Sequence, residues 1–246
     1  MKILLPPSET KRPGGSPHPL ALETLSLPSL HAAREQTVAA LVALSADPDA
    51  AARVLKLSAR QREDVDLNRR LREGPTMPAV DRYTGVLYDA LDASTLDAAS
   101  RRWLGEHVLI HSAPFGPVGA LDRIPAYRLA AGTSLPGIPP LRRHWAEATS
   151  AALAEVGCVL DLRSEAYVAL GPVPSTVSSA YVRVVTDAGR ALNHFNKKSK
   201  GALVLTLATE RSRVRTIDGL LRWAGERGVP LRRTEDAGIV ELVSVE

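Results

Sequence analysis

Residues 2–11 read KILLPPSETK, and this stretch decides how the fold begins. Residues 2–5 form a short apolar run of the length expected for a buried strand. Residues 6–19 contain five prolines and two glycines, so they cannot form regular structure. The chain is therefore predicted to open with a strand that leads directly into a long loop carrying Ser8, Glu9 and Lys11.

Other apolar runs predict further strands along the chain. They lie at residues 108–110, 158–162, 181–185 and 238–245. Helical patterns separate these runs, at residues 30–71, 94–104, 141–156, 198–210 and 216–227. Asp47 would cap a helix that starts at Pro48, and Ser94 with Asp97 resembles a capping box. Residues 74–78 are expected to break the chain, and the Pro/Gly-rich residues 114–119 are expected to form a bend.

No internal repeat, heptad run or low-complexity linker divides the chain into halves. With 45% apolar and 24% charged residues, its 246 residues have the balance of an ordinary globular protein. Aromatic residues make up only 4%, so the core must be built mainly from Leu, Val, Ala and Ile. The pattern predicts an α/β (mixed α+β) fold that forms one compact domain, residues 1–246.

A single cysteine, Cys158, excludes an intrachain disulfide and a Cys₄ or Cys₂His₂ zinc site. Its apolar neighbours favour an inert buried thiol. The N-terminal apolar run is too short for a signal-peptide core or a membrane span. We therefore expect a cytoplasmic protein with no membrane partner.

The net charge of +4 is unevenly distributed. Residues 190–233 contain eleven Lys or Arg and three acids, a local balance of +8, so the rest of the chain carries −4. A basic lobe beside an acidic body is typical of a surface that meets phosphates. A solvated helical face is an equally common explanation of such a pattern.

Four polar clusters lie just beyond predicted strands. The clusters are Ser8, Glu9 and Lys11; Asp122, Tyr127 and Arg128; Ser164, Glu165 and Tyr167; and Asn196, Lys197, Lys198 and Lys200. If the strands are parallel, loops at their carboxyl ends meet in one ligand crevice. For any one of these residues a turn or surface role is the commoner one, but four clusters together favour a site.

Two carboxylates among several cations and tyrosines suit a nucleotide, a base or a phosphate backbone. Glu9 or Glu165 could also act in acid–base chemistry. The run KKSKG, residues 197–201, opens a predicted helix and so suits an anion. The chain contains neither a Walker A loop nor a G-x-G-x-x-G motif, so no nucleotide cofactor of the usual kinds is expected.

Two other kinds of site lack support. His107 and His111 are four residues apart, but no third ligand lies at a suitable spacing, so we expect no metal. The chain also lacks the G-x-S-x-G elbow of α/β-hydrolases.

The sequence resembles the YaaA family of peroxide stress proteins. The matching stretches occur in the family's order and are KILLPPSETK (2–11), RYTGVLYDAL (82–91), LDRIPAYRLAAGT (121–133), HW (144–145), LRSEAYVAL (162–170) and NHFNKKSKGAL (193–203). The chain departs from the family at residues 112–116, which read SAPFG, and in the region after Arg211, where the match is poor.

The resemblance implies a family-specific α/β fold with a positively charged cleft and a helix-hairpin-helix element. It also implies DNA binding and a role in limiting peroxide damage by lowering available intracellular iron. Carried onto this sequence, the site residues are Ser8, Glu9, Lys11, Tyr83, Thr84, Gly85, Tyr88, Tyr127, Arg128, Thr133, Ser164, Glu165, Tyr167, Lys197, Lys198 and Lys200.

Three hypotheses follow. In the first, the protein binds duplex or distorted DNA: Lys197, Lys198, Lys200, Arg211, Arg213 and Arg215 contact phosphates, and Tyr83, Tyr127 or Tyr167 meets exposed bases. In the second, it is an enzyme acting on a nucleoside, a nucleobase or a damaged nucleotide, with Glu9 or Glu165 as acid–base and Tyr127 or Arg128 orienting this nucleotide-like substrate. In the third, it is a structural or partner-binding module. One cysteine and no haem motif leave no evident peroxidase centre.

Overall fold

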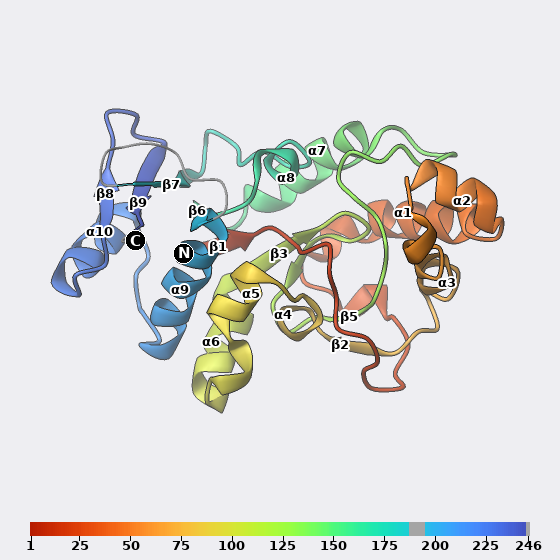
Figure 1. Cartoon of the computed structure of the whole chain (residues 1–246). Coiled ribbons are helices and arrows are strands. Elements are labelled where there is room, and N and C mark those ends of the chain that lie inside the picture. The colour runs from red at the N-terminus through yellow and green to blue at the C-terminus, as the bar shows by residue number, and fades with distance from the viewer. Residues whose placement is uncertain (187–194, 245–246) are drawn as a thin grey trace.

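The computed structural model describes residues 1–186 and 195–244 (Figure 1). In these residues seven strands form one sheet in the order β4-β3-β1-β6-β7-β9-β8. The five central strands run parallel, and the edge strands β4 and β8 are antiparallel to their neighbours. The strands are β1 (Lys2–Leu5), β3 (Val108–Ser112), β4 (Gly116–Gly119), β6 (Cys158–Asp161), β7 (Ser178–Val185), β8 (Leu231–Arg233) and β9 (Ile239–Val243). A separate antiparallel pair joins β2 (Thr76–Pro78) to β5 (Arg123–Pro125).

Helices cover both faces of the large sheet (Figure 1). α5, α6 and α9 lie on one side, and α7 and α8 lie on the other. α1, α2 and α3 gather at one end of the molecule, opposite α10, β8 and β9. The helices are α1 (His31–Leu44), α2 (Pro48–Val54), α3 (Asp64–Arg69), α4 (Ala79–Arg82), α5 (Val86–Leu91), α6 (Ala98–His107), α7 (Leu141–Leu153), α8 (Glu165–Val168), α9 (Phe195–Thr209) and α10 (Ile217–Glu226).

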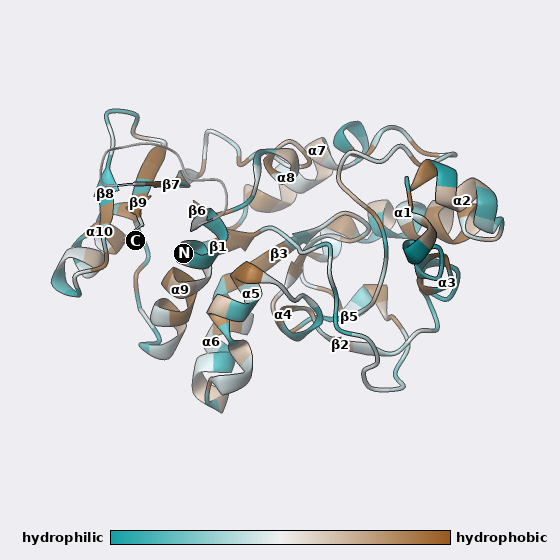
Figure 2. Ribbon diagram, in the orientation of Figure 1, coloured by the Kyte–Doolittle hydropathy of each residue, from teal (hydrophilic) through white to brown (hydrophobic). Residues whose placement is uncertain are grey.

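The alternation of side chains in β1 divides the core. Ile3 and Leu5 belong to the main cluster, whereas Leu4 packs with Leu109 and Val159 in a smaller cluster on the opposite face. Leu, Val, Ala and Ile supply most of both clusters, as the low aromatic content predicts. The hydrophobic colouring is strongest along the strands and on the inner sides of the helices (Figure 2).

The strands predicted to begin at residues 2, 108, 158, 181 and 238 are all present. The predicted end of the last strand, residue 245, lies outside the described residues. Asp47 caps α2, because its carboxylate accepts hydrogen bonds from the backbone N–H groups of Asp49 and Ala50. In the described part of the chain, no helix combines the length and the apolar character needed to cross a bilayer.

Three local predictions are wrong. The bend predicted at residues 114–119 contains β4, which pairs with β3; an edge strand tolerates Pro117 because one side of it needs no hydrogen-bond partner. The break at residues 74–78 contains β2. The cap of α6 is Asp97 rather than Ser94, because the Asp97 carboxylate accepts the N–H of Ser100 at 2.7 Å.

The parallel strands place the clusters that follow β1 and β6 at the same edge of the sheet, whereas Asp122 accepts the N–H of Gly119 at the end of β4, beside the start of β3. The chain passes from β1 to β3 on one side and from β6 to β7 on the other, so the winding direction changes between β1 and β6. In open α/β sheets the ligand crevice lies beyond the carboxyl ends of strands at such a point. The loops after β1 and β6 begin there.

Candidate functional site

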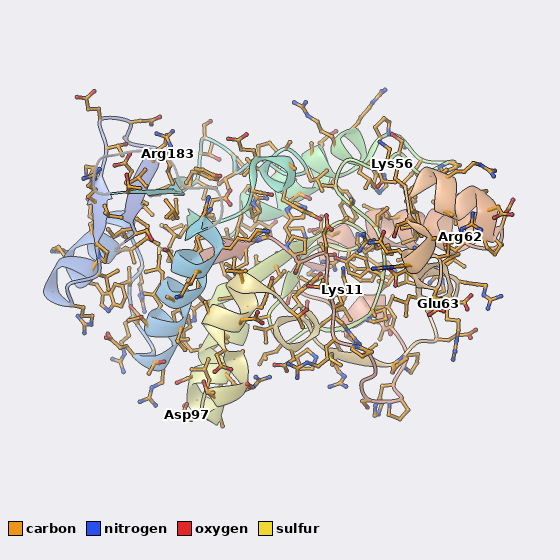
Figure 3. The ribbon with its side chains drawn as sticks, in the orientation of Figure 1. Lys11, Lys56, Arg62, Glu63, Asp97 and Arg183 are labelled. Atoms are coloured by element: carbon orange, nitrogen blue, oxygen red, sulfur yellow. The ribbon has the colours of Figure 1, made fainter. Side chains whose placement is uncertain are left out.

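The loop after β1 is held against α4 and α5. The N–H of Arg12 donates to the carbonyl of Arg82 at 2.8 Å, and the hydroxyl of Tyr88 donates to the carbonyl of Pro6 at 2.7 Å. Within the loop, the Lys11 ammonium donates to the carbonyls of Ser8 and Glu9 at 3.0 and 3.2 Å. These bonds hold Lys11 at the edge of the sheet where the parallel strands end, which we call the carboxyl edge (Figure 3).

A group of buried tyrosines lies beneath Lys11. The Lys11 ammonium is 4.1 Å from the ring centre of Tyr127, a cation–π distance. The hydroxyls of Tyr83 and Tyr127 are hydrogen-bonded at 2.8 Å, and the Tyr83 ring packs 5.3 Å from that of Tyr88. Burial raises the pKa of all three tyrosines, so they are neutral hydrogen-bonding groups.

This arrangement corrects the predicted stacking role of two tyrosines. Tyr83 and Tyr127 are each only 2% exposed, so their rings are covered by protein and cannot meet a base in this structure. Tyr167 is partly exposed, with its ring 5.9 Å from that of His111. The sequence could not reveal this burial, because tyrosine is common both in cores and at binding surfaces.

Lys11 should make stability depend on pH. Burial, and then the nearby Arg128 charge, lowers its pKa to about 7, whereas an unfolded lysine has a pKa of about 10.4. Between these values the unfolded chain binds more protons, so stability rises with pH. Relative to Lys11→Met, the parent's free energy of unfolding should increase by up to about 1.4 kcal/mol per pH unit from pH 7 to 10. Urea unfolding of both proteins across this range measures it, and a pH-independent difference would contradict it.

Lys11 also lines a pocket of about 680 Å³, which we call the Lys11 pocket. Its wall is formed by the loop after β1, the end of α2 and the segment 128–134 that follows β5. Glu9, Arg128 and Thr133, all predicted site residues, lie in this wall. The structure therefore joins parts of the first and second predicted clusters.

The two glutamates considered for acid–base chemistry do not share a pocket. Glu9 lines the Lys11 pocket, whereas Glu165 begins α8 and lines a second pocket of about 640 Å³ with Asp161 and Tyr181. Both glutamates are solvent-exposed. Glu9 and Glu165 therefore do not share the one site that converging clusters would have formed.

The start of α9 divides its lysines into two kinds. Lys197 and Lys198 are exposed and available to an anion. Lys200 is only 4% exposed, and its ammonium lies 5.3 Å from the ring centre of Tyr181. Burial lowers the pKa of Lys200 to about 8, although the Asp161 charge acts in the opposite direction. The prediction that Lys200 contacts phosphate therefore conflicts with the structure, because the helical spacing turns this residue inward.

The predicted arginines lie at the opposite edge of the sheet. Arg211, Arg213 and Arg215 line a pocket of about 720 Å³ with Met1 and Ser178, near the amino ends of β1 and β7. The helix α9 continues for twelve residues beyond Lys197, to Thr209, so it places the arginines about 18 Å from Lys197 along its axis, at 1.5 Å per residue. The basic lobe is thus divided between two edges, and Arg190 lies outside the described residues.

The remaining predicted residues are turn and loop groups near Lys11. The Thr84 hydroxyl donates to that of Thr10 at 3.0 Å, and Ser8 lies 3.3 Å from the same hydroxyl. Gly85 has a φ of 96°, a conformation that favours glycine. Ser164 is exposed at the start of α8.

The two histidines do not form a pair. His107 ends α6 and stacks on Trp103 at 4.3 Å, whereas His111 lies within β3. His111 is fully buried, and its Nε2 is without a hydrogen-bond partner in the described structure.

Sequence reasoning missed several charged groups. Arg163 is buried and its guanidinium bonds the Asp161 carboxylate at 2.6 and 2.9 Å and His111 Nδ1 at 2.8 Å. The i, i+2 spacing of Asp161 and Arg163 at a strand end was the available signal. Arg53 and Lys56 also line the Lys11 pocket, but no motif marks them.

Comparison with known proteins shows the family to which the chain belongs. The family model described as "Peroxide stress protein YaaA" matches residues 1–227. A UPF0246 protein of Corynebacterium glutamicum (strain R) is 43% identical over 235 residues, covering 93% of this chain and 94% of the relative. UPF0246 proteins of Corynebacterium efficiens and Streptomyces coelicolor are 48% and 44% identical, covering 85% and 84% of this chain and 85% and 82% of each relative. The chain belongs to the YaaA family of peroxide stress proteins.

Proposed function

We propose that this protein binds DNA in the peroxide stress response and contacts phosphates through residues 210–216, which we call the arginine loop. Bound protein would limit oxidative damage to DNA, and a lower level of available iron would accompany that protection. The observation that carries the proposal is three exposed arginines within five residues, Arg211, Arg213 and Arg215. In the described residues none of them forms an ion pair with an acid within 4 Å.

The backbone of the loop supports a role for the Arg211 side chain. Its φ is 50°, and the loop closes α9 by a Schellman motif, in which Ser212 N–H donates to the carbonyl of Leu207 at 3.0 Å. Glycine is favoured at such a position. The equivalent residue after α10 is Gly228, with a φ of 64°. An arginine kept where glycine is less strained favours a function for its guanidinium.

The loop also connects two helices, as a helix-hairpin-helix element would. It lies between α9 and α10, and the Thr216 hydroxyl caps α10 by accepting the N–H of Gly219 at 3.1 Å. Unpaired arginines beside a helix N-terminus suit phosphate oxygens, which accept charge-assisted hydrogen bonds. These contacts carry no base information, so weak sequence preference is expected.

Fluorescence anisotropy with labelled duplex and bubble DNA tests the proposal. The triple variant Arg211→Gly, Arg213→Ala, Arg215→Ala should bind at least about tenfold more weakly at low salt. Its slope of log affinity against log salt should be shallower by about 2–3, since each lost phosphate contact removes about 0.9. The charge-matched control Arg60→Ala, Arg142→Ala, Arg143→Ala removes exposed arginines elsewhere and should keep the parent slope.

A Lys197→Ala, Lys198→Ala variant locates the surface. If this variant flattens the slope and the arginine variant does not, DNA binds at the carboxyl edge and the arginine-loop assignment is wrong. If neither protein nor variants bind at low salt, the DNA-binding proposal itself fails.

A further inference from the structure

The Lys11 pocket is cationic and lies at the edge of the sheet opposite the arginine loop. Four basic residues line it: Lys11 from the loop after β1, Arg53 and Lys56 from the end of α2, and Arg128 after β5. Glu9 is the one acid among its lining residues. Such an excess of positive charge in a concave wall raises the local concentration of anions.

Lys56 lines the pocket from a backbone conformation that favours glycine. Its φ is 54°, and it occupies the glycine position of the Schellman motif that ends α2. Leu57 N–H donates to the carbonyl of Ala52 at 2.9 Å, and Lys56 N–H donates to that of Arg53 at 3.3 Å. The same position of the motif is Gly228 after α10 and Arg211 after α9, so helix closure does not itself require a lysine here.

Arg128 is positioned by its backbone and remains incompletely paired. Asn68 clamps that backbone, accepting the Arg128 N–H and donating to its carbonyl, each at 2.8 Å. The guanidinium lies 3.9 Å from Glu9 and 4.0 Å from Asp64, beyond hydrogen-bond distance. Among the described residues, its guanidinium thus forms two long ion pairs but no hydrogen bond, which leaves its donors available to a closer anionic partner.

The rest of the wall sets the size and character of the ligand. The pocket volume of about 680 Å³ is within the range of small-molecule sites. Val54, Leu55 and Leu129 place apolar surface beside the cations. A ligand that uses both features has a doubly charged group joined to a flat or apolar body.

We propose that the Lys11 pocket binds a phosphate monoester of mononucleotide size, with the phosphate held by Arg53, Lys56 and Arg128. The apolar wall beside them takes the ligand's base or other apolar body. This inference is independent of DNA binding at the arginine loop. The two surfaces lie at opposite edges of the sheet, and each can fail without the other.

Isothermal titration calorimetry at low salt tests the inference with AMP, adenosine and inorganic phosphate as probes. AMP should bind saturably and at least about tenfold more tightly than adenosine or phosphate, since only AMP engages both parts of the wall. Arg53→Ala with Lys56→Gly should weaken AMP binding at least about tenfold. Lys56→Arg should keep it, and Arg60→Ala, a nearby exposed arginine outside the pocket wall, should leave it unchanged.

The Lys56→Gly change also provides a control for misfolding. Lys56→Gly removes backbone strain, so its thermal midpoint should not fall below that of the parent. Equal binding of AMP and adenosine, or unchanged binding in the double variant, overturns the inference. Displacement of AMP by duplex DNA whose ends carry no phosphate also overturns the inference, because the pocket would then be part of the protein surface that binds DNA. AMP binding by a protein that does not bind DNA would support the inference and reject only the proposed function.

Discussion

Replacing Arg163 with Met should lower the free energy of unfolding by about 3–5 kcal/mol. Arg163 is fully buried and its guanidinium forms a two-point ion pair with Asp161, at 2.6 and 2.9 Å. It also donates to the carbonyl of Gly171 at 2.9 Å. The variant leaves the buried Asp161 carboxylate without its countercharge. Urea unfolding at pH 7 measures the loss.

A double variant separates the cost of an orphaned charge from the value of the pair. Arg163→Met with Asp161→Leu removes both charges and should recover a substantial part of the stability lost in the single variant. If the single change costs less than about 1 kcal/mol, Asp161 finds another partner or becomes protonated, and the proposed ion pair is not a main support of the carboxyl edge.

Replacing Arg34 with Met should cost about 3 kcal/mol, because it leaves several buried carbonyls without donors. Arg34 lies in α1 and is fully buried. Its guanidinium donates to Phe115 and Pro117 at 2.9 and 2.8 Å and to Ser26 at 2.7 Å. Burial lowers its pKa to about 10, so it remains charged near neutral pH. It thus ties α1 to the turn and edge strand after β3.

The exposed Arg72 supplies the matched control. It pairs at 2.6 Å with Glu35, which lies in α1 as Arg34 does, but both of these side chains are partly exposed to solvent. Arg72→Ala should change the free energy of unfolding by no more than about 1 kcal/mol. Urea unfolding of both variants gives the comparison. An equal loss in the free energy of unfolding would show that burial adds nothing to the contribution of Arg34 to stability.

The sequence predicted those features that depend on neighbouring residues. The apolar runs predicted the strands but not their parallel arrangement, and Asp47 with Pro48 predicted the start of α2, because a cap is formed within one turn of chain. The strands β4 and β2 were missed, since their Pro- and Gly-rich residues become strands only by pairing with partners that local patterns do not contain.

The candidate site shows the same division. Ser8, Glu9 and Lys11 were expected to follow β1, and the parallel strands confirm their place at the carboxyl edge. The burial of Tyr83, Tyr127 and Lys200 was not predictable, because their residue types occur both in cores and on binding surfaces. Arg53 and Lys56 join the pocket only through the packing of α2 against the loop after β5.

The sequence by itself determined the family, the α/β class and the loops that carry polar residues, because motifs and periodicity are local properties of the chain. Only the tertiary structure divided the basic residues between two edges of one sheet. It also decided which of them face solvent. That outcome depends on α9, a rigid helix whose two ends lie about 22 Å apart.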